Sequence, residues 1–321
     1  MFTFIYCFDE NYNIQGFVSI MSLLDKVSEK INIVIVHKQK EKFSKYEKLI
    51  NNHNNLENLD IKEINTKDIE FPNIDNNHVS EATYYRMYLD QIEFDNTFNK
   101  CVYLDADIIC LNNPINYFQE IYTKLQEEGK PLAARTDYIK FKNELHEDDV
   151  FIRNRLSSIN YFNAGVLLFD YQNWIDKGYF EELRNIQKNY DGQIKFWDQD
   201  LLNVLIDGNY IEMNHFSNFH IAADWNYPAH ITESHAIFLH YQGKPKPWHI
   251  SFINDSSTKF FQENYRKLLG EKVFITKSTL SRDLKGFFKL IFSLQIFKCS
   301  YPLSTLKEGI KALFFSSSIN Q

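Results

Sequence analysis

Short apolar runs alternate with helical spacing through the N-terminal part of the chain. FTFIYCF (2–8) and INIVIV (31–36) predict strands buried on both faces, and IKEI (61–64) is a third candidate strand. Between them, apolar residues recur at helical spacing over 16–27 and 41–50. Strand, helix, strand, helix and strand in this order predict an α/β protein with a doubly wound parallel sheet.

The alternation continues less regularly after residue 80. Ser80 is a candidate N-cap for a helix over 80–93, and CVYLDADIIC (101–110) predicts a strand that ends at the turn 112–114. The polar stretch 140–158 predicts a surface excursion, and 208–235 is expected to be irregular. Further strands are expected at 131–135, 161–170 and 236–241, and helices at 171–189 and at 198–206, the last capped by Asp198.

The C-terminal tail changes character. Residues 282–297 and 304–315 predict basic amphipathic helices with Phe-rich apolar faces, a pattern typical of proteins that lie on a membrane surface. Ordinary packing on the main domain is the alternative, and we favour the membrane. The 321 residues therefore divide into a main domain, 1–265, and a basic helical tail, 266–321.

Charge and cysteine usage narrow the class of partner. The net charge of −7 disfavours sequence-independent nucleic-acid binding, yet residues 277–311 hold seven basic and two acidic residues, which suits an anionic surface. The sequence contains no run of about 18 apolar residues, so we expect no transmembrane helix. The N-terminus has no signal-peptide pattern. The cysteines, none spaced as CxxC, indicate reduced thiols. We expect a cytoplasmic protein attached to the inner face of the membrane.

Two carboxylates, Asp105 and Asp107, interrupt the apolar run 101–110. If the strand continues that far, both side chains face the same side, at an edge where α/β sheets bind ligands. A hard divalent cation would neutralise them, and N-capping with a salt bridge is the alternative. His240 could complete such a site or be a core histidine, and the lysines that follow suit phosphate.

Six short motifs occur in an order that resembles the family 8 retaining glycosyltransferases, which include glycogenin and bacterial lipopolysaccharide galactosyl- and glucosyltransferases. The motifs are CFDENY (7–12), YYRM (84–87), YLDAD (103–107), FNAGV (162–166), DQD (198–200) and HYQGKPKPWH (240–249). The resemblance covers about residues 1–265. It implies a GT-A fold, a Rossmann-like mixed sheet flanked by helices. It also implies a UDP-sugar donor, UDP-galactose or UDP-glucose, and Mn²⁺, with Mg²⁺ as the alternative metal.

The resemblance also implies roles for individual residues. Metal ligands would be Asp105, Asp107 and His240. Contacts to the nucleotide and its diphosphate would come from Cys7, Asp9, Asn11, Ala106, Gly243 and Lys246. The donor sugar would be surrounded by Arg86, Asn163, Ala164, Asp198 and Gln199. Asp137 would lie between donor and acceptor, and His78 would approach the acceptor. For Asp200, helix capping is as good an interpretation as function.

We therefore expect a hexosyltransferase that acts on a surface glycan, with lipopolysaccharide or lipooligosaccharide core favoured. One alternative is a transferase that extends glycan on a serine-rich surface protein. Another is a non-catalytic nucleotide-sugar or carbohydrate-binding protein, which the intact candidate ligands disfavour. A metal-dependent phosphohydrolase would need more carboxylates around the metal.

Overall fold

The main structural element is a seven-stranded mixed sheet with the order β3-β2-β1-β4-β7-β6-β8. This computed structural model describes residues 1–67, 69–72, 80–95, 98–140, 149–224, 229–243, 246–270, 273–277, 279–299 and 301–314. The strands are β1 (Thr3–Phe8), β2 (Ile31–His37), β3 (Leu56–Glu63), β4 (Lys100–Leu104), β6 (Leu132–Ile139), β7 (Asn160–Asp170) and β8 (Ile211–Glu212).

The predicted parallel opening is confirmed, because β1 pairs in parallel with both β2 and β4, and β2 with β3. The sheet becomes mixed at β7, which is antiparallel to β4 and to β6. A smaller sheet joins β5 (Ile108–Cys110), β10 (Phe238–His240) and β9 (Phe219–His220).

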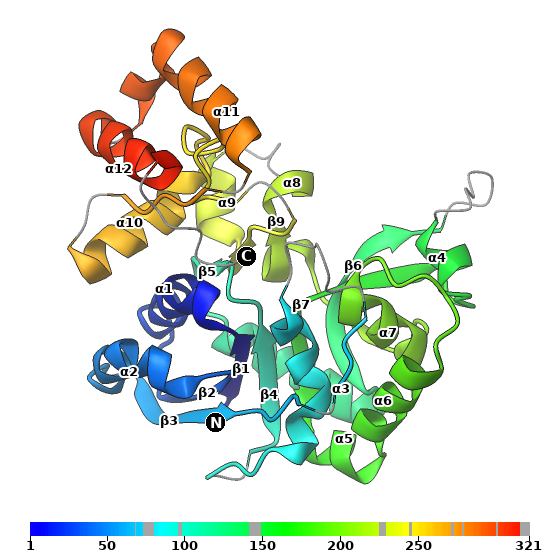
Figure 1. Cartoon of the computed structure of the whole chain (residues 1–321). Helices are drawn as coiled ribbons and strands as arrows, with labels where there is room; N and C mark the ends of the chain where they lie inside the picture. The colour runs from blue at the N-terminus through cyan, green and yellow to red at the C-terminus, as the bar shows by residue number, and fades with distance from the viewer. Residues whose placement is uncertain are drawn as a thin grey trace.

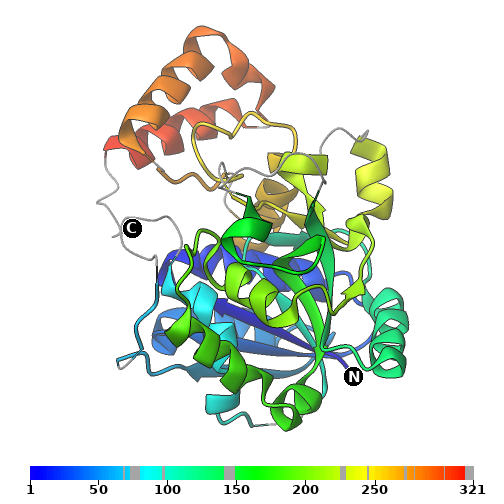
Figure 2. The ribbon, with the colours of Figure 1, turned by 90° about the vertical axis from the view of Figure 1, so that its right-hand side faces the viewer.

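Helices cover both faces of the large sheet, so its central strands are apolar on both sides. In β1, Phe4, Tyr6 and Phe8 join one core cluster, whereas Ile5 and Cys7 join the other. The first cluster lies under α1 (Asn13–Leu24), α2 (Ser44–Asn51) and α3 (Ile115–Glu128). The second lies under the 3₁₀ helix η3 (Glu81–Gln91), α5 (Tyr171–Asp176), α6 (Tyr179–Asn189) and α7 (Trp197–Ile206). Figures 1 and 2 show α1 and α2 on the side opposite to α6 and α7.

The strand expected at 101–110 is wrong in one respect that matters for the site. It is two strands, β4 and β5, in different sheets, and residues 105–107 form the turn between them. The turn takes both carboxylates out of the hydrogen-bonded ladder of the large sheet. The Asp105 N–H donates to the Gly165 carbonyl at 2.9 Å, which attaches the turn to β7.

Other predicted elements differ in shape or length. Ser80 caps as predicted and accepts from the Ala82 N–H, but the helix is of the 3₁₀ type and has a non-helical Tyr88 (φ −121°). The helix 171–189 is two helices separated by Gly178, whose φ of +69° ends α-helical geometry. The segment 208–235 is more regular than expected, with β8, β9, α8 (Ile221–Asp224), α9 (Ala229–His235) and η4 (His215–Asn218).

The last helices along the chain form the C-terminal end of the molecule (Figures 1 and 2). They are α10 (Thr258–Leu269), α11 (Leu280–Phe292), η5 (Gln295–Lys298) and α12 (Pro302–Phe314). Phe287 and Leu290 of α11 are buried against Ile250 and Ile253. The two tail helices therefore do pack on the main domain through part of their apolar surface. Among the described helices, none combines the length and apolarity that a bilayer crossing needs. Three short helices complete the description: η1 (Glu10–Tyr12), η2 (Lys40–Phe43) and α4 (Val150–Arg153).

Candidate active site

The turn after β4 brings two carboxylates to a buried histidine from β10. His240 Nε2 lies 3.4 Å from Asp107 Oδ1 and 3.6 Å from Asp105 Oδ2. One ligand atom from each of the three residues lies within 4.8 Å of the others, which is the spacing of a possible metal site. Two carboxylates and one imidazole suit Mg²⁺ or Mn²⁺, with the nitrogen favouring Mn²⁺.

Asn218 determines which ring nitrogen of His240 carries the proton. Its Oδ1 lies 2.9 Å from His240 Nδ1, while its Nδ2 donates to Asn163 Oδ1 at 2.9 Å. Because an amide oxygen can only accept, Nδ1 carries the proton and Nε2 keeps its lone pair. The ring of His240 is thus arranged as a metal ligand with its second nitrogen held by a neighbour.

Lys246 neutralises Asp107 in this structure. Its ammonium donates to Asp107 Oδ2 and, at 2.7 Å, to the Tyr241 carbonyl. Burial disfavours the Asp107 carboxylate, but the positive charge of Lys246 outweighs it and holds the pKa of Asp107 well below its usual range. Burial likewise disfavours the Lys246 ammonium, and Asp107 more than compensates, which raises the pKa of the lysine.

One buried oxygen in this cluster has no such partner. Among the described residues, Asp107 Oδ1 accepts no hydrogen bond. It faces His240 Nε2, which carries a lone pair and no proton, so two hydrogen-bond acceptors lie 3.4 Å apart. A cation placed between them would satisfy both atoms, and the residues present therefore fit a divalent metal ion.

A second buried ion pair adjoins the first cluster. Arg86 of η3 places its Nε 2.6 Å from Asp198 Oδ2, its Nη2 3.4 Å from Asp105 Oδ1 and its guanidinium 3.7 Å from the Tyr103 ring centre. It also donates to the Ala164 carbonyl. Burial raises the pKa of Asp198 to about 6, although Arg86 and a hydrogen bond from Thr83 act in the opposite direction. One arginine thus contacts both Asp105 and Asp198.

Gln199, Asn163 and Ala164 lie together beside this ion pair. Gln199 Oε1 accepts from the Ala164 N–H at 2.9 Å and from Asn163 Nδ2 at 3.3 Å. Asn163 Nδ2 also donates to Gln242 Oε1 at 3.0 Å. The structure therefore brings together the residues expected around the donor sugar, and their roles stay predictions.

The residues expected to contact the nucleotide lie at the ends of several elements. Cys7 is a buried thiol next to the last residue of β1, and Asp9 caps η1 by accepting from the Asn11 N–H at 3.0 Å. Ala106 is buried in the metal-side turn, and Gly243 follows β10 with a φ of +64°. The contacts that these residues make with a nucleotide stay predictions.

Of the two residues expected near the acceptor, one is described. Asp137 lies on β6 with a side chain that is 12 % exposed, and its Oδ1 is 3.4 Å from Nδ1 of the buried His220. His78 falls outside the residues that the structure describes.

The two aspartates of the DQD motif have different roles. Asp198 does not cap α7 as predicted, because its carboxylate faces Arg86 and Thr83. Asp200 instead accepts from the backbone N–H groups of Lys195 and Phe196, at 2.8 and 2.9 Å, and pairs with Arg153. Asp200 is fully buried and holds the turn that precedes α7, which is a structural role, but it lies inside the helix and α7 has no side-chain N-cap.

Three contributors to the site were missed from the sequence. Asn218 and His220 lie in a segment that has no periodic signal, although the pattern Asn-x-His next to aromatic residues is unusual for a solvated loop. Gly165 matters for space: a Cβ there would lie 2.3 Å from His240 Cε1 and 2.9 Å from Asp105 Oδ2. The backbone of β7 thus lies directly behind the candidate metal ligands His240 and Asp105.

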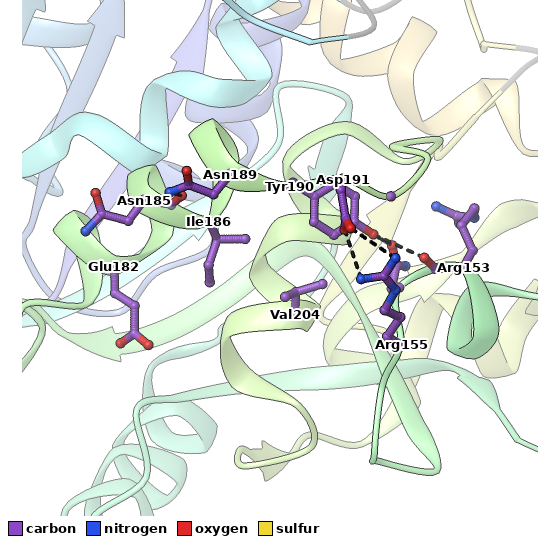
Figure 3. A pocket seen from close by; sticks show the side chains of 11 residues that line it. Arg153, Arg155, Glu182, Asn185, Ile186, Asn189, Tyr190, Asp191 and Val204 are labelled. Atoms are coloured by element: carbon purple, nitrogen blue, oxygen red, sulfur yellow. Dashed lines mark hydrogen bonds and ion pairs between the residues drawn. The ribbon is translucent and has the colours of Figure 1, made fainter.

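A separate pocket of about 470 Å³ lies between α6, α7 and the chain after α4 and contains none of these residues. Figure 3 shows Asn185, Ile186 and Asn189 of α6 on one side and Arg153 and Arg155 on the other. Arg155 forms an exposed ion pair with Asp191. The candidate metal-binding side chains Asp105, Asp107 and His240 do not line this pocket.

The chain is similar in sequence to several known proteins. The sequence pattern described as "Glycosyl transferase family 8" matches residues 3–251. A lipopolysaccharide 1,2-glucosyltransferase of Escherichia coli K12 is 30 % identical over 53 % of this chain and 50 % of its own length. A second E. coli protein of that name is 21 % identical over 80 % of this chain and 76 % of its own. The chain thus spans half of one relative and three quarters of the other.

Solved structures show the same architecture. Galactosyltransferase LgtC, determined in complex with donor and acceptor sugar analogs, superimposes with a TM-score of 0.63 at 23 % identity, over 84 % of this chain and 96 % of its own. The bifunctional glycosyltransferase WbbM superimposes with a TM-score of 0.60 at 20 % identity, over 82 % of this chain and 49 % of its own. At these identities the likeness concerns the fold.

Proposed function

The chain belongs to glycosyl transferase family 8 and has the GT-A fold, and from this premise we propose that it transfers a hexose from a UDP-sugar, with Mn²⁺, to a glycan hydroxyl with retention of anomeric configuration. The observation that carries the proposal is the cluster of Asp105, Asp107 and His240, which fits a metal ion beside the Arg86–Asp198 pair. Galactose and glucose are the candidate sugars.

In this proposal the residues around the metal site stabilise the departing nucleotide. A metal bound by Asp105, Asp107 and His240 would offset the negative charge that develops on the diphosphate. Lys246, which now donates to Asp107, is close enough to the cluster to add a positive charge for the same oxygens. Gly243 has no side chain and lets the backbone approach the diphosphate closely.

The residues on the sugar side orient the donor and exclude water. The anomeric carbon gains positive charge as its bond to phosphate breaks, and the Gln199 and Asn163 amides would surround it. Both oxygens of Asp198 are engaged, Oδ1 by Thr83 and Oδ2 by Arg86, which disfavours Asp198 as a nucleophile. We therefore favour attack from the leaving-group side. The acceptor oxygen forms the new bond to carbon, the carbon–phosphate oxygen bond breaks, and the acceptor proton passes to the departing phosphate.

UDP release from UDP-galactose, UDP-glucose and other UDP-sugars, with Mn²⁺ or with EDTA, tests this proposal. We expect slow Mn²⁺-dependent release from one hexose donor, because water replaces the missing acceptor, and the first sugar released should have the α configuration by NMR. Asp107→Asn should abolish release without loss of the fold, whereas Asn185→Ala, in the separate pocket, should not alter it. Release that is equal in EDTA, or an Asp107→Asn variant with wild-type activity, would contradict the metal-dependent transfer.

The acceptor that we propose is a lipid-linked surface glycan of the lipopolysaccharide core type. The support comes from the relatives named as lipopolysaccharide glucosyltransferases and from the C-terminal helices. Several large apolar side chains of these helices are exposed: Phe288 (49 %), Phe292 (80 %), Leu294 (65 %), Phe297 (71 %), Leu303 (82 %) and Phe314 (61 %). With Lys285, Lys289 and Lys298 nearby in sequence, this surface suits an anionic leaflet of the cytoplasmic membrane face.

Vesicle co-sedimentation tests the membrane proposal. The protein should sediment with phosphatidylglycerol vesicles and much less with phosphatidylcholine vesicles, and binding should weaken as salt rises. Phe292→Ser combined with Phe297→Ser should reduce binding, because about 3 kcal/mol of apolar transfer is lost for two rings that are already mostly exposed. The double variant Ile139→Ser/Ile159→Ser, on the main domain, is the control. Unchanged binding of the Phe292/Phe297 variant would refute this role.

A further inference from the structure

His220 is a buried histidine between the metal-side cluster and Asp137. It lies on β9, where it pairs in register with His240 of β10, and its side chain is fully buried. Its ring packs edge-on against the His240 ring, with centroids 5.5 Å apart and an interplanar angle of 82°. The imidazole of His220 therefore covers one side of His240, the candidate metal ligand.

The other side of His220 faces a carboxylate of the neighbouring sheet. Nδ1 of His220 lies 3.4 Å from Oδ1 of Asp137. The two atoms are in contact at this distance without forming a hydrogen bond, and among the described residues neither ring nitrogen of His220 has a hydrogen-bond partner. A neutral imidazole protonated at Nδ1 would need only a small shift to donate to the Asp137 carboxylate, and it would hold the carboxylate without cancelling its charge.

The backbone of His220 is fixed from the same strand that carries Asp137. Its N–H donates to Asp224 Oδ2 at 2.9 Å. Arg135, two residues before Asp137, pairs with Asp224 and donates to the Asn218 carbonyl at 2.6 Å. The two sheets are thus tied together on both sides of His220, and the ring has a defined position relative to Asp137.

We propose that His220 is a positioning residue that orients the Asp137 carboxylate toward the acceptor side of the reaction and keeps it from turning to the metal. The inference rests on the proposed transfer function. Asp137 is the carboxylate expected between donor and acceptor, and the imidazole of His220 stands between it and the metal ligand His240. A carboxylate that turned to the metal could no longer contact the incoming acceptor hydroxyl.

A double-mutant cycle on Mn²⁺-dependent hydrolysis of the accepted UDP-sugar tests the proposal. His220→Phe keeps an aromatic wall for His240 but loses the N–H. We expect it to lower kcat about tenfold with a donor KM and a Mn²⁺ dissociation constant within about twofold of wild type. In the Asp137→Asn background the same substitution should have little further effect, because its partner is already changed. His220→Asn, whose amide N–H can occupy the place of Nδ1–H, should recover most of kcat.

The matched control is His53→Phe, which removes a histidine paired with Asp25 far from the site and should leave kcat unchanged. Multiplicative effects of His220→Phe and Asp137→Asn, or no recovery in a folded His220→Asn, would overturn the proposal. If His220→Phe fails to fold, His220→Asn and His220→Gln replace it: Gln, with its N–H displaced, should lose the activity that Asn keeps. A wild-type protein without UDP release would instead refute the transfer function and the inference with it.

Discussion

Replacing Gly165 by alanine should disable the metal site while leaving the backbone of β7 intact. Gly165 is not among the residues with positive φ, so alanine is compatible with its conformation. The obstacle is space, because the new Cβ would lie 2.3 Å from His240 Cε1. Ordinary carbon–carbon contact begins at about 3.5 Å, so the His240 ring must move by about 1.2 Å.

Such a shift is large compared with what metal coordination tolerates. Ligand distances in functional sites hold to about 0.2 Å, and changes one shell further out already cost about 10–100-fold in affinity. We therefore expect Gly165→Ala to raise the Mn²⁺ dissociation constant by about 100-fold or more, with about 1–3 kcal/mol lost in unfolding free energy through overpacking. Asp105 Oδ2, 2.9 Å from the new atom, would be displaced in the same direction.

Electron paramagnetic resonance of free Mn²⁺, titrated with protein and UDP, measures this constant directly. Gly129→Ala is the control, because its left-handed φ of +62° makes alanine cost about 1–2 kcal/mol while no atom lies within 4 Å of the new Cβ. It should match the stability loss and keep the Mn²⁺ affinity. A folded Gly165→Ala protein that binds Mn²⁺ as the wild type does would refute the placement of His240 and Asp105 around one ion.

Four further predictions concern Asp198, Asn218 and Asp200. Because burial raises the pKa of Asp198 to about 6, turnover should fall as the pH drops below about 6 and Arg86 loses its charged partner, and Asp198→Asn should remove that limb of the pH profile. Because the pKa of Asp198 rises from 3.8 to about 6 on folding, the folded protein binds this proton more tightly than the unfolded chain does. The contribution of Asp198 to the unfolding free energy, measured in denaturant titrations, should therefore decline as the pH rises from about 4 to 6. Asn218→Ala should raise the Mn²⁺ dissociation constant about 10–100-fold in the same resonance assay, since His240 loses the partner that fixes its tautomer. Asp200→Asn should lower the unfolding free energy by about 3 kcal/mol, because Arg153 stays buried without its charged partner, and an unchanged melting temperature would contradict that assignment.

The fold was predictable where the pattern reflects burial on both faces of a sheet. In β1 and β2 every residue is buried, so the apolar runs at 2–8 and 31–36 gave the strands directly. The break at Asp105 was not predictable, because β-branched residues continue on both sides of it. The chain leaves the large sheet there for tertiary reasons, and the departure creates the turn that holds both carboxylates.

The candidate site was predictable as a set of residue types and not as an arrangement. Lys246 and Asp107 are 139 positions apart in sequence, so no local pattern could pair them. The short strand β9 was missed because two residues show no periodicity, and with it Asn218 and His220 were missed. Gly165 lay inside a quoted motif, yet its importance follows from the closeness of His240, which is visible in three dimensions alone.

The measurement that tests the central claim most directly is a crystal structure of the protein with MnCl₂ and UDP, with anomalous data collected near the manganese edge. The account predicts one strong anomalous peak within bonding distance of Asp105, Asp107 and His240 Nε2, with the diphosphate beside it and Lys246 moved from Asp107 toward phosphate. A peak elsewhere, or an empty cluster with Lys246 still paired to Asp107 while UDP is bound, would contradict it.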